Sequence, residues 1–228
     1  MKKKDIKILL IDDEPDILEI IGYNLTSEGY QVFKADNGKE GIKTAKNISP
    51  HLIIMDVMMP EMDGIETCEK IRAHSEFSET IVVFLTARNE DYSQVAGFEA
   101  GADDYIPKPI KPKVLISKVK ALLRRIKNPV SNSKDTLKVG KLIIDNEAYK
   151  VINKGEEIFL PRKEFELLSL LTSKPGKVFK REDILFQVWG NEVVVGGRTI
   201  DVHIRKLREK IGEKSFKTVK GVGYKYVV

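Results

Sequence analysis

Polar residues with metal-binding or proton-donating groups follow four apolar runs in the first half of the chain. Asp12 and Asp13 come directly after residues 6–11, Asp56 after 51–55, Thr86 after 81–85, and Lys108 shortly after 104–106. Three carboxylates close together repel one another unless a cation lies among them, and hard oxygen ligands with room for water suit Mg²⁺. A single Asp at a strand end often only caps the next helix, but the whole set favours a Mg²⁺-binding pocket.

The apolar runs that carry these residues alternate with helical patterns. Five strands are predicted at 6–11, 31–33, 51–55, 81–85 and 104–106, with helical patterns between them such as 15–27 and 89–99. Nearly continuous Ile, Leu and Val in three of the strands is typical of parallel strands covered on both faces. The alternation predicts an α/β fold with a five-stranded doubly wound parallel sheet. Its carboxyl strand ends share one edge, where the polar residues would converge.

Four segments resemble the receiver domain of two-component response regulators. They are Leu10–Pro15, Met55–Gly64, Leu85–Ala87 and Gly101–Pro109, and the resemblance covers nearly all of residues 1–125. It implies a flavodoxin-like sheet with Asp56 as phosphoacceptor, a sensor histidine kinase as donor, and no other enzymatic activity. It also implies that Asp12, Asp13, Asp56 and the Met58 carbonyl arrange Mg²⁺. Thr86 and Lys108 would bind phosphoryl oxygens, and Lys108–Pro109 would be a cis bond. These roles suit phosphoryl transfer, which needs positioning and electrostatic stabilisation of the equatorial oxygens.

The same resemblance implies a switch and a dimer. After phosphorylation Thr86 would move to the phosphoryl group and the ring of Tyr105 would turn inward, although Tyr105 by itself could be an ordinary half-buried aromatic residue. A symmetric dimer would form through charged side chains that otherwise read as a solvated face. These are Glu99, Asp103, Asp104, Lys118, Lys120 and Arg125. Gln94 and Val114 stand where many relatives place an opposite-charge pair, which predicts a weaker or more apolar dimer.

The charge of the chain is divided unevenly between its two halves. The 228 residues carry a net charge of +5, which separates into −3 for residues 1–125 and +8 for residues 126–228. Residues 126–136 are polar, contain Pro129 and show no periodicity, which predicts a flexible linker. We therefore expect two domains, at 1–125 and 137–228, with an anionic polymer as partner of the second.

The second half changes from strands to helices and back to a hairpin. Strands are predicted at 137–145, 148–153 and 157–160 with a turn at Lys154–Gly155, and helices near 161–173, 181–189 and 198–211. The chain closes with a basic hairpin over 216–227 that turns at 221–223 and carries Lys217, Thr218, Lys220 and Lys225. This order is typical of an α+β winged helix-turn-helix domain.

Helix 198–211 has one apolar stripe and several cations. Ile200, Ile204, Leu207 and Ile211 repeat at helical spacing and predict the side that faces a core. Away from that stripe we expect Arg198, Thr199, His203, Arg205, Lys206 and Lys210. Such a helix fits the major groove of double-stranded DNA but could also be an ordinary solvated helix. The basic hairpin beside it favours nucleic acid.

Five segments of this half are similar to the winged-helix effector domain of the OmpR/PhoB family. They are Glu164–Leu168, Arg181–Leu185, Val188–Gly190, Arg198–Arg208 and Thr218–Tyr224, and the similarity covers 137–228. It implies that Lys206 reads bases, that Arg198, Thr199, His203 and Arg205 contact phosphates, and that the Lys220 wing tip enters the minor groove. Lys210, Thr218 and Tyr224 complete the expected DNA-binding set, and loop 190–197 would contact RNA polymerase unless Val193–Val195 only pack. Pro161 departs from the family pattern by removing a capping box with Glu164.

Composition excludes several other classes of protein. A single cysteine excludes an intramolecular disulfide framework and any cysteine-based zinc site. No apolar run approaches the roughly 20 residues of a membrane span, and the short run after Lys2–Lys4 is no export signal, so we expect a cytoplasmic protein without a membrane partner.

The favoured interpretation is a sequence-specific DNA-binding transcriptional regulator that dimerises when Asp56 is phosphorylated. A Mg²⁺-dependent phosphatase with an Asp nucleophile is one alternative, but it needs a second Asp two residues later, where Met58 stands. A constitutive basic module that binds RNA or an acidic protein is another. It lacks the stacking aromatic residues common in single-strand binders and predicts that Asp56→Asn changes nothing.

Overall fold

The computed structural model divides the chain into two compact units, Met1–Asn128 and Pro129–Val228. It describes residues 2–87, 97, 100–127, 136–146, 148–190 and 198–228, without the side chains of 87, 124–127 and 198. No helix among these residues has the length and apolar character needed to cross a membrane.

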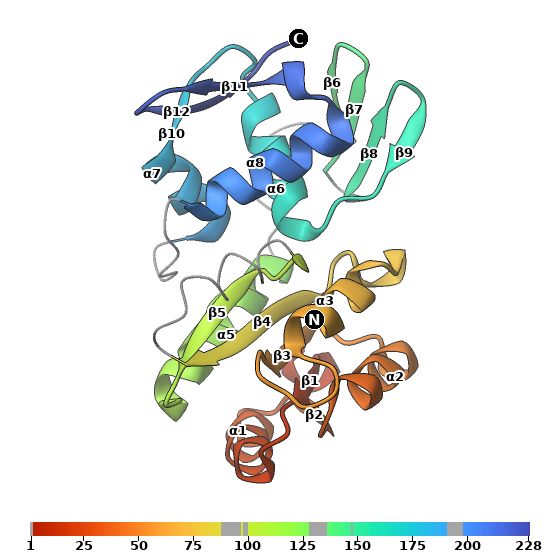
Figure 1. The fold of residues 1–228 in the computed structure, drawn as a ribbon, viewed down its shortest axis with the longest axis vertical. Helices are drawn as coiled ribbons and strands as arrows, with labels where there is room; N and C mark the ends of the chain where they lie inside the picture. The colour runs from red at the N-terminus through yellow and green to blue at the C-terminus, as the bar shows by residue number, and fades with distance from the viewer. Residues whose placement is uncertain (1, 88–96, 98–99, 128–135, 147, 191–197) are drawn as a thin grey trace. The chain divides into compact units, whose positions relative to one another are not determined.

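The first unit is built on a five-stranded parallel sheet in the order β2-β1-β3-β4-β5, which confirms the predicted doubly wound fold (Figure 1). The strands are β1 (Lys7–Ile11), β2 (Gln31–Ala35), β3 (Leu52–Asp56), β4 (Ile81–Ala87) and β5 (Asp104–Lys108). The helices are η1 (Lys3–Asp5), α1 (Pro15–Ser27), α2 (Gly38–Ile48), α3 (Gly64–Arg72), η2 (Ser75–Phe77) and α5 (Pro112–Lys127).

Helices cover the sheet on both faces, as the continuous apolar strands predict. Leu18, Ile21 and Leu25 of α1 join Leu115 and Val119 of α5 in one core cluster with alternate residues of the sheet. Helices α2 and α3 pack on the opposite face. Strand order reverses between β1 and β3, and an open α/β sheet forms its ligand site beyond the carboxyl ends at such a point.

The described residues of the second unit form two antiparallel sheets and five helical segments. The first sheet has the order β6-β7-β8-β9, and the second the order β10-β12-β11. The strands are β6 (Thr136–Val139), β7 (Leu142–Asp145), β8 (Lys150–Asn153), β9 (Glu156–Ile158), β10 (Phe179–Lys180), β11 (Phe216–Val219) and β12 (Gly223–Tyr226). The helices are α6 (Arg162–Thr172), α7 (Arg181–Ile184), the π-helix η3 (Leu185–Trp189), α8 (Arg198–Ile211) and η4 (Glu213–Ser215).

Three details in this unit and at its boundary differ from the sequence prediction or bear on it. The run 137–145 is two strands because Gly140 adopts a left-handed φ of 60° and turns the chain back on itself. Residues 126 and 127 continue helix α5, and Thr136 already belongs to β6, so both edges of the predicted linker lie in regular structure. Pro161 precedes α6 without a side-chain cap, as expected from the missing capping box.

One core joins the helices and sheets of the second unit. The predicted apolar stripe of α8 is confirmed, since Ile200, Ile204, Leu207 and Ile211 are all buried in it. Trp189 of η3 and Phe216 of β11 are among its largest fully buried side chains. The cationic residues of α8 are thus carried on a helix whose opposite side is fixed by packing.

Candidate functional site

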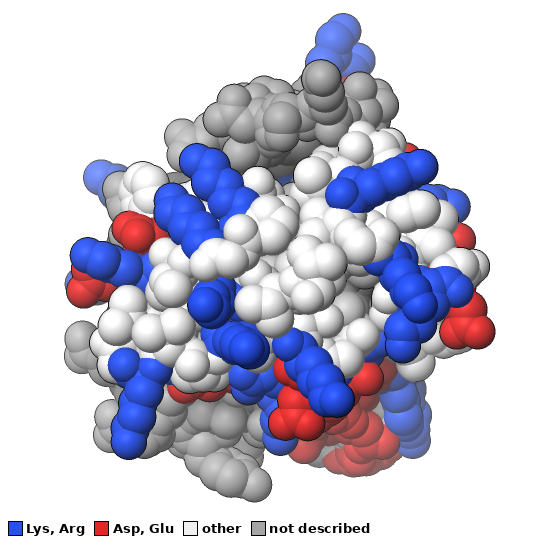
Figure 2. Space-filling view, turned by 90° about the horizontal axis from the view of Figure 1, so that it is seen from above, with Lys and Arg blue, Asp and Glu red and all other residues white. Residues whose placement is uncertain are grey.

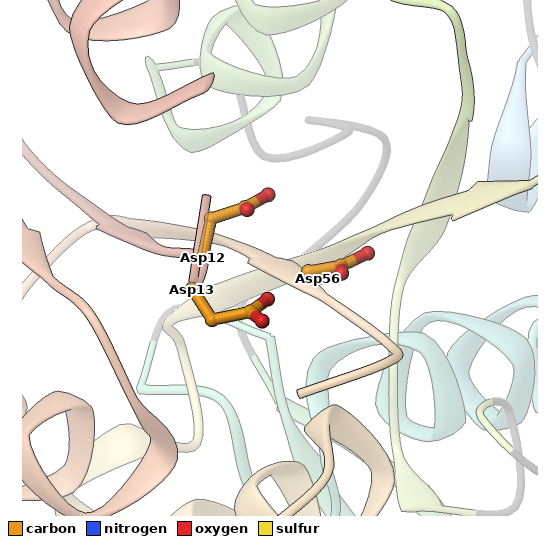
Figure 3. A group of neighbouring side chains, drawn as sticks. All are labelled: Asp12, Asp13 and Asp56. Carbon is orange, nitrogen blue, oxygen red and sulfur yellow. The ribbon is translucent and has the colours of Figure 1, made fainter. Parts of the chain in front are cut away.

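The three aspartates predicted to converge do so at the carboxyl ends of β1 and β3. Asp12 and Asp13 follow β1, Asp56 is the last residue of β3, and their carboxylate oxygens lie within 4.8 Å of one another. Figure 3 shows the three side chains next to one another. Asp12 and Asp56 are buried whereas Asp13 is exposed. The group therefore combines two shielded carboxylates with one that reaches solvent.

Lys108 from the end of β5 lies against this group. Its Nζ is 3.3 Å from Asp12 Oδ2 and 3.3 Å from Asp56 Oδ1. The same Nζ is 2.9 Å from Glu14 Oε1, a contact that the sequence reasoning missed. The Lys108–Pro109 peptide bond is cis, as predicted. One ammonium group thus contacts three carboxylates.

Burial and charge shift the ionisation of this group. Burial raises the pKa of Asp12 and of Asp56 above the ordinary value, and the charge of Lys108 only partly opposes this. For Lys108 burial acts to lower the pKa, but the hydrogen bond to Glu14 and the charges of Asp56 and Asp12 outweigh it and leave the pKa raised. The pocket carries more negative charge than one lysine neutralises, so it favours an additional cation.

The oxygen atoms present fit a hard divalent cation. Asp12 Oδ1 accepts the backbone N–H of Glu14 at 2.9 Å, and the buried Asp12 Oδ2 lies 3.3 Å from Lys108 Nζ, which also contacts Asp56 and Glu14. Buried carboxylates that share one ammonium group are stabilised further by an additional cation. The donor set is entirely oxygen, and exposed Asp13 leaves room for water ligands, as Mg²⁺ prefers.

The backbone after β3 is held close to Asp56. A Cβ on Gly64, the first residue of α3, would lie 2.1 Å from the Asp56 carbonyl oxygen, so only glycine fits there. Gly64 also donates its N–H to Val57 O at 2.9 Å. Within the loop that joins β3 to α3, Glu61 has a left-handed φ of 62°. Met58, in the same loop, is 68% exposed. This tight loop places the Met58 backbone beside the end of β3.

The two predicted switch residues are both buried. Thr86 is the penultimate residue of β4 and is 3% exposed. Tyr105 is 6% exposed, and its ring centroid lies 5.6 Å from that of Phe84. A Cβ on Gly97 would clash with the Tyr105 hydroxyl, which shows that the ring points into the unit. The structure therefore has Tyr105 in the inward position.

The predicted dimer residues differ in exposure, because Asp103 and Asp104 are buried whereas Lys120 is exposed. The interpretation of all of them as one solvated charged face is therefore wrong. Asp103 is buried and accepts from Arg72 at 2.8 Å, and Asp104 is buried and lies 3.1 Å from Lys118 Nζ. Lys120 pairs with Glu28 at 2.9 Å. Glu99, Gln94 and the side chain of Arg125 lie outside the described residues, whereas Val114 is 55% exposed as an apolar residue on α5. The two aspartates are internal because Asp103, just before β5, pairs with Arg72 at the end of α3, and Asp104, the first residue of β5, pairs with Lys118 of α5.

The residues predicted to bind DNA from α8 also separate into exposed and buried. Arg205 and Lys210 are exposed, Lys206 is half-buried, and the side chain of Arg198 lies outside the described residues. Lys210 Nζ lies 2.7 Å from Oε2 of the buried Glu164. Thr199 and His203 are buried, so the expectation that they lie on the exposed side of the helix is wrong.

His203 is held inside the unit by its neighbours. Its Nδ1 lies 2.9 Å from the Thr199 carbonyl oxygen, and its ring packs edge-on against Trp189 with centroids 5.1 Å apart. Burial, together with the nearby charges of Lys206, Lys163 and Lys210, lowers the pKa of His203 to about 4. His203 is therefore a neutral packing residue at physiological pH rather than a surface cation.

A second network joins α8 to the closing hairpin. Tyr224 of β12 is buried, donates its hydroxyl hydrogen to Asp201 of α8, and accepts from Arg181 at 3.1 Å. Burial, followed by the hydrogen bond to Asp201, raises the pKa of Tyr224 to about 12. Arg208 donates to Thr218 Oγ1 at 2.8 Å. Asp201, Arg181 and Arg208 were not singled out from the sequence, because their role becomes visible only when three distant segments meet.

The hairpin end of the second unit is rich in exposed cations. Figure 2 views this end, and Lys and Arg side chains spread over it while Asp and Glu lie toward its rim. Lys217, Thr218 and Lys220 lie on β11 and the following turn, where Gly221 has a φ of 74°. Lys217, Thr218 and Lys220 are all exposed. The predicted wing is thus a basic hairpin fixed to α8 by hydrogen bonds.

Both units match known protein families. Residues 8–120 match the response regulator receiver domain, and residues 155–226 match the C-terminal domain of transcriptional regulatory proteins. The transcriptional regulatory protein SrrA of Staphylococcus aureus is 40% identical over 97% of this chain and 95% of its own length. The chain belongs to the OmpR/PhoB family of response regulators.

Solved structures agree with this family. DrrB of Thermotoga maritima, described as an OmpR/PhoB homologue, is 34% identical over 98% of this chain and 99% of its own, with a TM-score of 0.50. A mutant of RitR with one cysteine replaced by aspartate is 27% identical over 97% of this chain and 98% of its own, with a TM-score of 0.78. As an OmpR/PhoB-family member, the chain is a two-component transcriptional regulator and not a metabolic enzyme. Its acidic pocket is the characteristic site of the receiver domain.

Proposed function

We propose that Asp56 accepts a phosphoryl group from a sensor histidine kinase and that this controls sequence-specific binding to double-stranded DNA. The convergence of Asp12, Asp13 and Asp56 within 4.8 Å, with Lys108 against two of them, is the observation that carries the proposal. Asp56 is the proposed nucleophile because it is the only one of these aspartates that ends β3, between β1 and β4. It thus lies at the centre of the strand ends, between the carboxylates of β1 and the hydroxyl of Thr86.

Asp12, Asp13, Asp56 and the Met58 carbonyl are the residues proposed to hold Mg²⁺. The ion would neutralise the carboxylates and the charge on the incoming phosphoryl group. Lys108 would supply a second positive charge to the phosphoryl oxygens, and the Thr86 hydroxyl a hydrogen bond. During transfer the phosphorus–nitrogen bond of a kinase phosphohistidine breaks and a phosphorus–oxygen bond to Asp56 forms.

Phosphorylation would act through Thr86 and Tyr105. Recruitment of the Thr86 hydroxyl to the phosphoryl group would favour the inward Tyr105 ring already present in the structure. We propose that this state forms a homodimer in which exposed Val114 contributes apolar contact, together with charged groups on α5. A dimer brings two DNA-binding units together and so raises their effective concentration at adjacent half-sites.

The second unit would read DNA with α8 and the wing. Lys206 is proposed to contact bases, Arg198 and Arg205 to contact phosphates, and Lys220 to enter the minor groove. Thr199, His203 and Tyr224 would act indirectly, because their buried side chains fix α8 and the wing in place. Contact of loop 190–197 with RNA polymerase and a cytoplasmic location stay predictions.

Phosphate incorporation tests the proposed phosphoacceptor. Incubated with acetyl phosphate and Mg²⁺, the wild type should gain one phosphate by intact-protein mass spectrometry, and the Asp56→Asn variant should gain none. Asp16→Asn is the matched control, because Asp16 is an exposed carboxylate in the first turn of α1. It should be labelled like the wild type. Equal labelling of the wild type and Asp56→Asn would overturn the assignment.

A further inference from the structure

Among the residues that the structure describes, Glu14 has the carboxylate that lies nearest to the Lys108 ammonium. The Lys108 Nζ to Glu14 Oε1 distance is 2.9 Å, against 3.3 Å to Asp12 and 3.3 Å to Asp56. The Glu14 side chain is 59% exposed, whereas the side chains of Asp12 and Asp56 are 2% and 8% exposed. Lys108 is thus drawn toward the solvent side of the pocket by a carboxylate outside the metal-binding group.

The backbone of Glu14 is fixed to the pocket although its side chain reaches solvent. Glu14 donates its N–H to Asp12 Oδ1 at 2.9 Å, and Pro15 begins α1 directly after it. Glu14 is the N-cap residue of this helix and its carbonyl accepts from both Ile17 and Leu18. These contacts determine where the Glu14 side chain starts, so its contact with Lys108 does not depend on a mobile loop.

We propose that Glu14 is a positioning residue that restrains Lys108 before phosphorylation and competes with the phosphoryl group for it afterwards. The inference rests on the proposed phosphorylation of Asp56. An ammonium group has three N–H donors, and three carboxylates already surround it. Phosphorylation converts the Asp56 carboxylate into the phosphorylated group, so the phosphoryl oxygens compete for Lys108 with the two partners that remain, Asp12 and Glu14. Glu14 is the partner that water can resolvate most readily, because it is the most exposed of the three.

The contact therefore opposes the phosphorylated state by a limited amount. Exposed ion pairs contribute little net stability, since water and salt screen them and two long side chains must be ordered. Loss of the Glu14 charge should strengthen binding of a phosphoryl group by about two- to fivefold. A change in this direction also separates the proposal from general damage to the pocket, which would weaken binding.

Beryllium fluoride at saturating Mg²⁺ is the probe, because it mimics a phosphoryl group on a carboxylate without a covalent reaction. Its dissociation constant can be measured on the full chain from the bound ¹⁹F NMR signal. The Glu14→Gln variant should bind about two- to fivefold more tightly than the wild type. Asp16→Asn removes the same charge from the first turn of α1, two residues away, and should bind like the wild type.

Three results would overturn the role of Glu14: unchanged affinity in Glu14→Gln, weaker affinity, or equal tightening in Glu14→Gln and Asp16→Asn. The last result would indicate a general field effect rather than release of Lys108. Failure of the underlying function gives a different pattern. In that case the wild type does not bind beryllium fluoride, or Asp56→Asn binds it equally well.

Discussion

At the scale of single residues, burial decides which charged or titratable groups act on a ligand and which hold the fold. Lys108 is partly exposed and contacts Asp12 and Asp56, so it can meet a phosphoryl group. His203 is buried, packs against Trp189, and has a pKa of about 4. Both residues occur in segments that suggest anion binding, yet only Lys108 offers a positive charge at physiological pH.

His203 makes the stability of the second unit depend on pH. In the unfolded chain its pKa is near 6.5, so between pH 6.5 and about 4 the unfolded state binds a proton that the folded state does not. The free energy of unfolding should therefore fall as pH decreases through this window, by about 3 kcal/mol in full. Urea unfolding followed by the fluorescence of Trp189, the single tryptophan, measures this unit alone.

The His203→Gln variant is the test of this assignment. His203 is the only histidine of residues 129–228. Ordinary Asp and Glu carboxyl groups have pKa values near 4, so roughly between pH 5 and 6.5 His203 is the main group expected to take up a proton on unfolding. The variant should lose the pH dependence between pH 5 and 6.5, roughly the range above ordinary carboxylate pKa values. An unchanged slope in the variant would show that another group takes up the proton.

At the scale of elements, strand ends and helix starts place the reacting groups. The end of β3 supplies Asp56, and α3 begins at Gly64, whose missing side chain allows the helix to approach the Asp56 carbonyl. In the second unit α8 is fixed by its apolar stripe, by His203, and by the hydrogen bond from Tyr224 to Asp201. Both functional surfaces therefore depend on contacts between elements that are distant in sequence.

Gly64→Ala should damage the phosphorylation site without changing any reacting group. The new Cβ would lie 2.1 Å from the Asp56 carbonyl oxygen and 3.0 Å from the Val57 Cα, both backbone atoms that cannot move alone. We expect a loss of about 1–3 kcal/mol in unfolding free energy, together with slower phosphorylation by acetyl phosphate. Gly22→Ala is the control, because its Cβ would approach most closely only the flexible end of Lys34. Equal effects of the two substitutions would contradict this account.

Lys206→Ala should reduce sequence discrimination by α8. A side chain that reads bases contributes about 1–3 kcal/mol to specific binding and little to binding of random DNA. Fluorescence anisotropy with a selected site and with random DNA, at one salt concentration, measures both affinities. Lys214→Ala removes an exposed cation from η4 and serves as the control. Equal loss on both DNAs would make Lys206 a phosphate contact.

Sequence periodicity and the positions of strand ends predicted most of the fold and the group of aspartates. The features that could not be predicted depend on contacts between residues that are distant in sequence. The five strands, the apolar stripe of α8 and the convergence of Asp12, Asp13 and Asp56 follow from local patterns. The burial of Asp103 could not be predicted, because its partner Arg72 lies 31 residues earlier. The contact of Glu14 with Lys108 spans 94 residues and depends on the order of strands in the sheet.

At the scale of the whole molecule, the chain joins an acidic pocket to a basic DNA-binding unit. Residues 1–125 carry a net charge of −3 and residues 126–228 a net charge of +8. The excess of cations in the second half supplies sequence-independent attraction to DNA, which salt weakens. Attraction of this kind acts whether or not Asp56 is phosphorylated, so regulation requires the dimer to add affinity at specific sites.

Genomic footprinting tests this central claim most directly. Wild type and Asp56→Asn are each incubated with genomic DNA, Mg²⁺ and acetyl phosphate at one salt concentration, and protected sites are mapped. Our account predicts discrete paired half-sites for the phosphorylated wild type and strongly reduced occupancy of the same sites for Asp56→Asn. Equal occupancy of the same sites by both proteins would contradict it and would support a constitutive DNA-binding module.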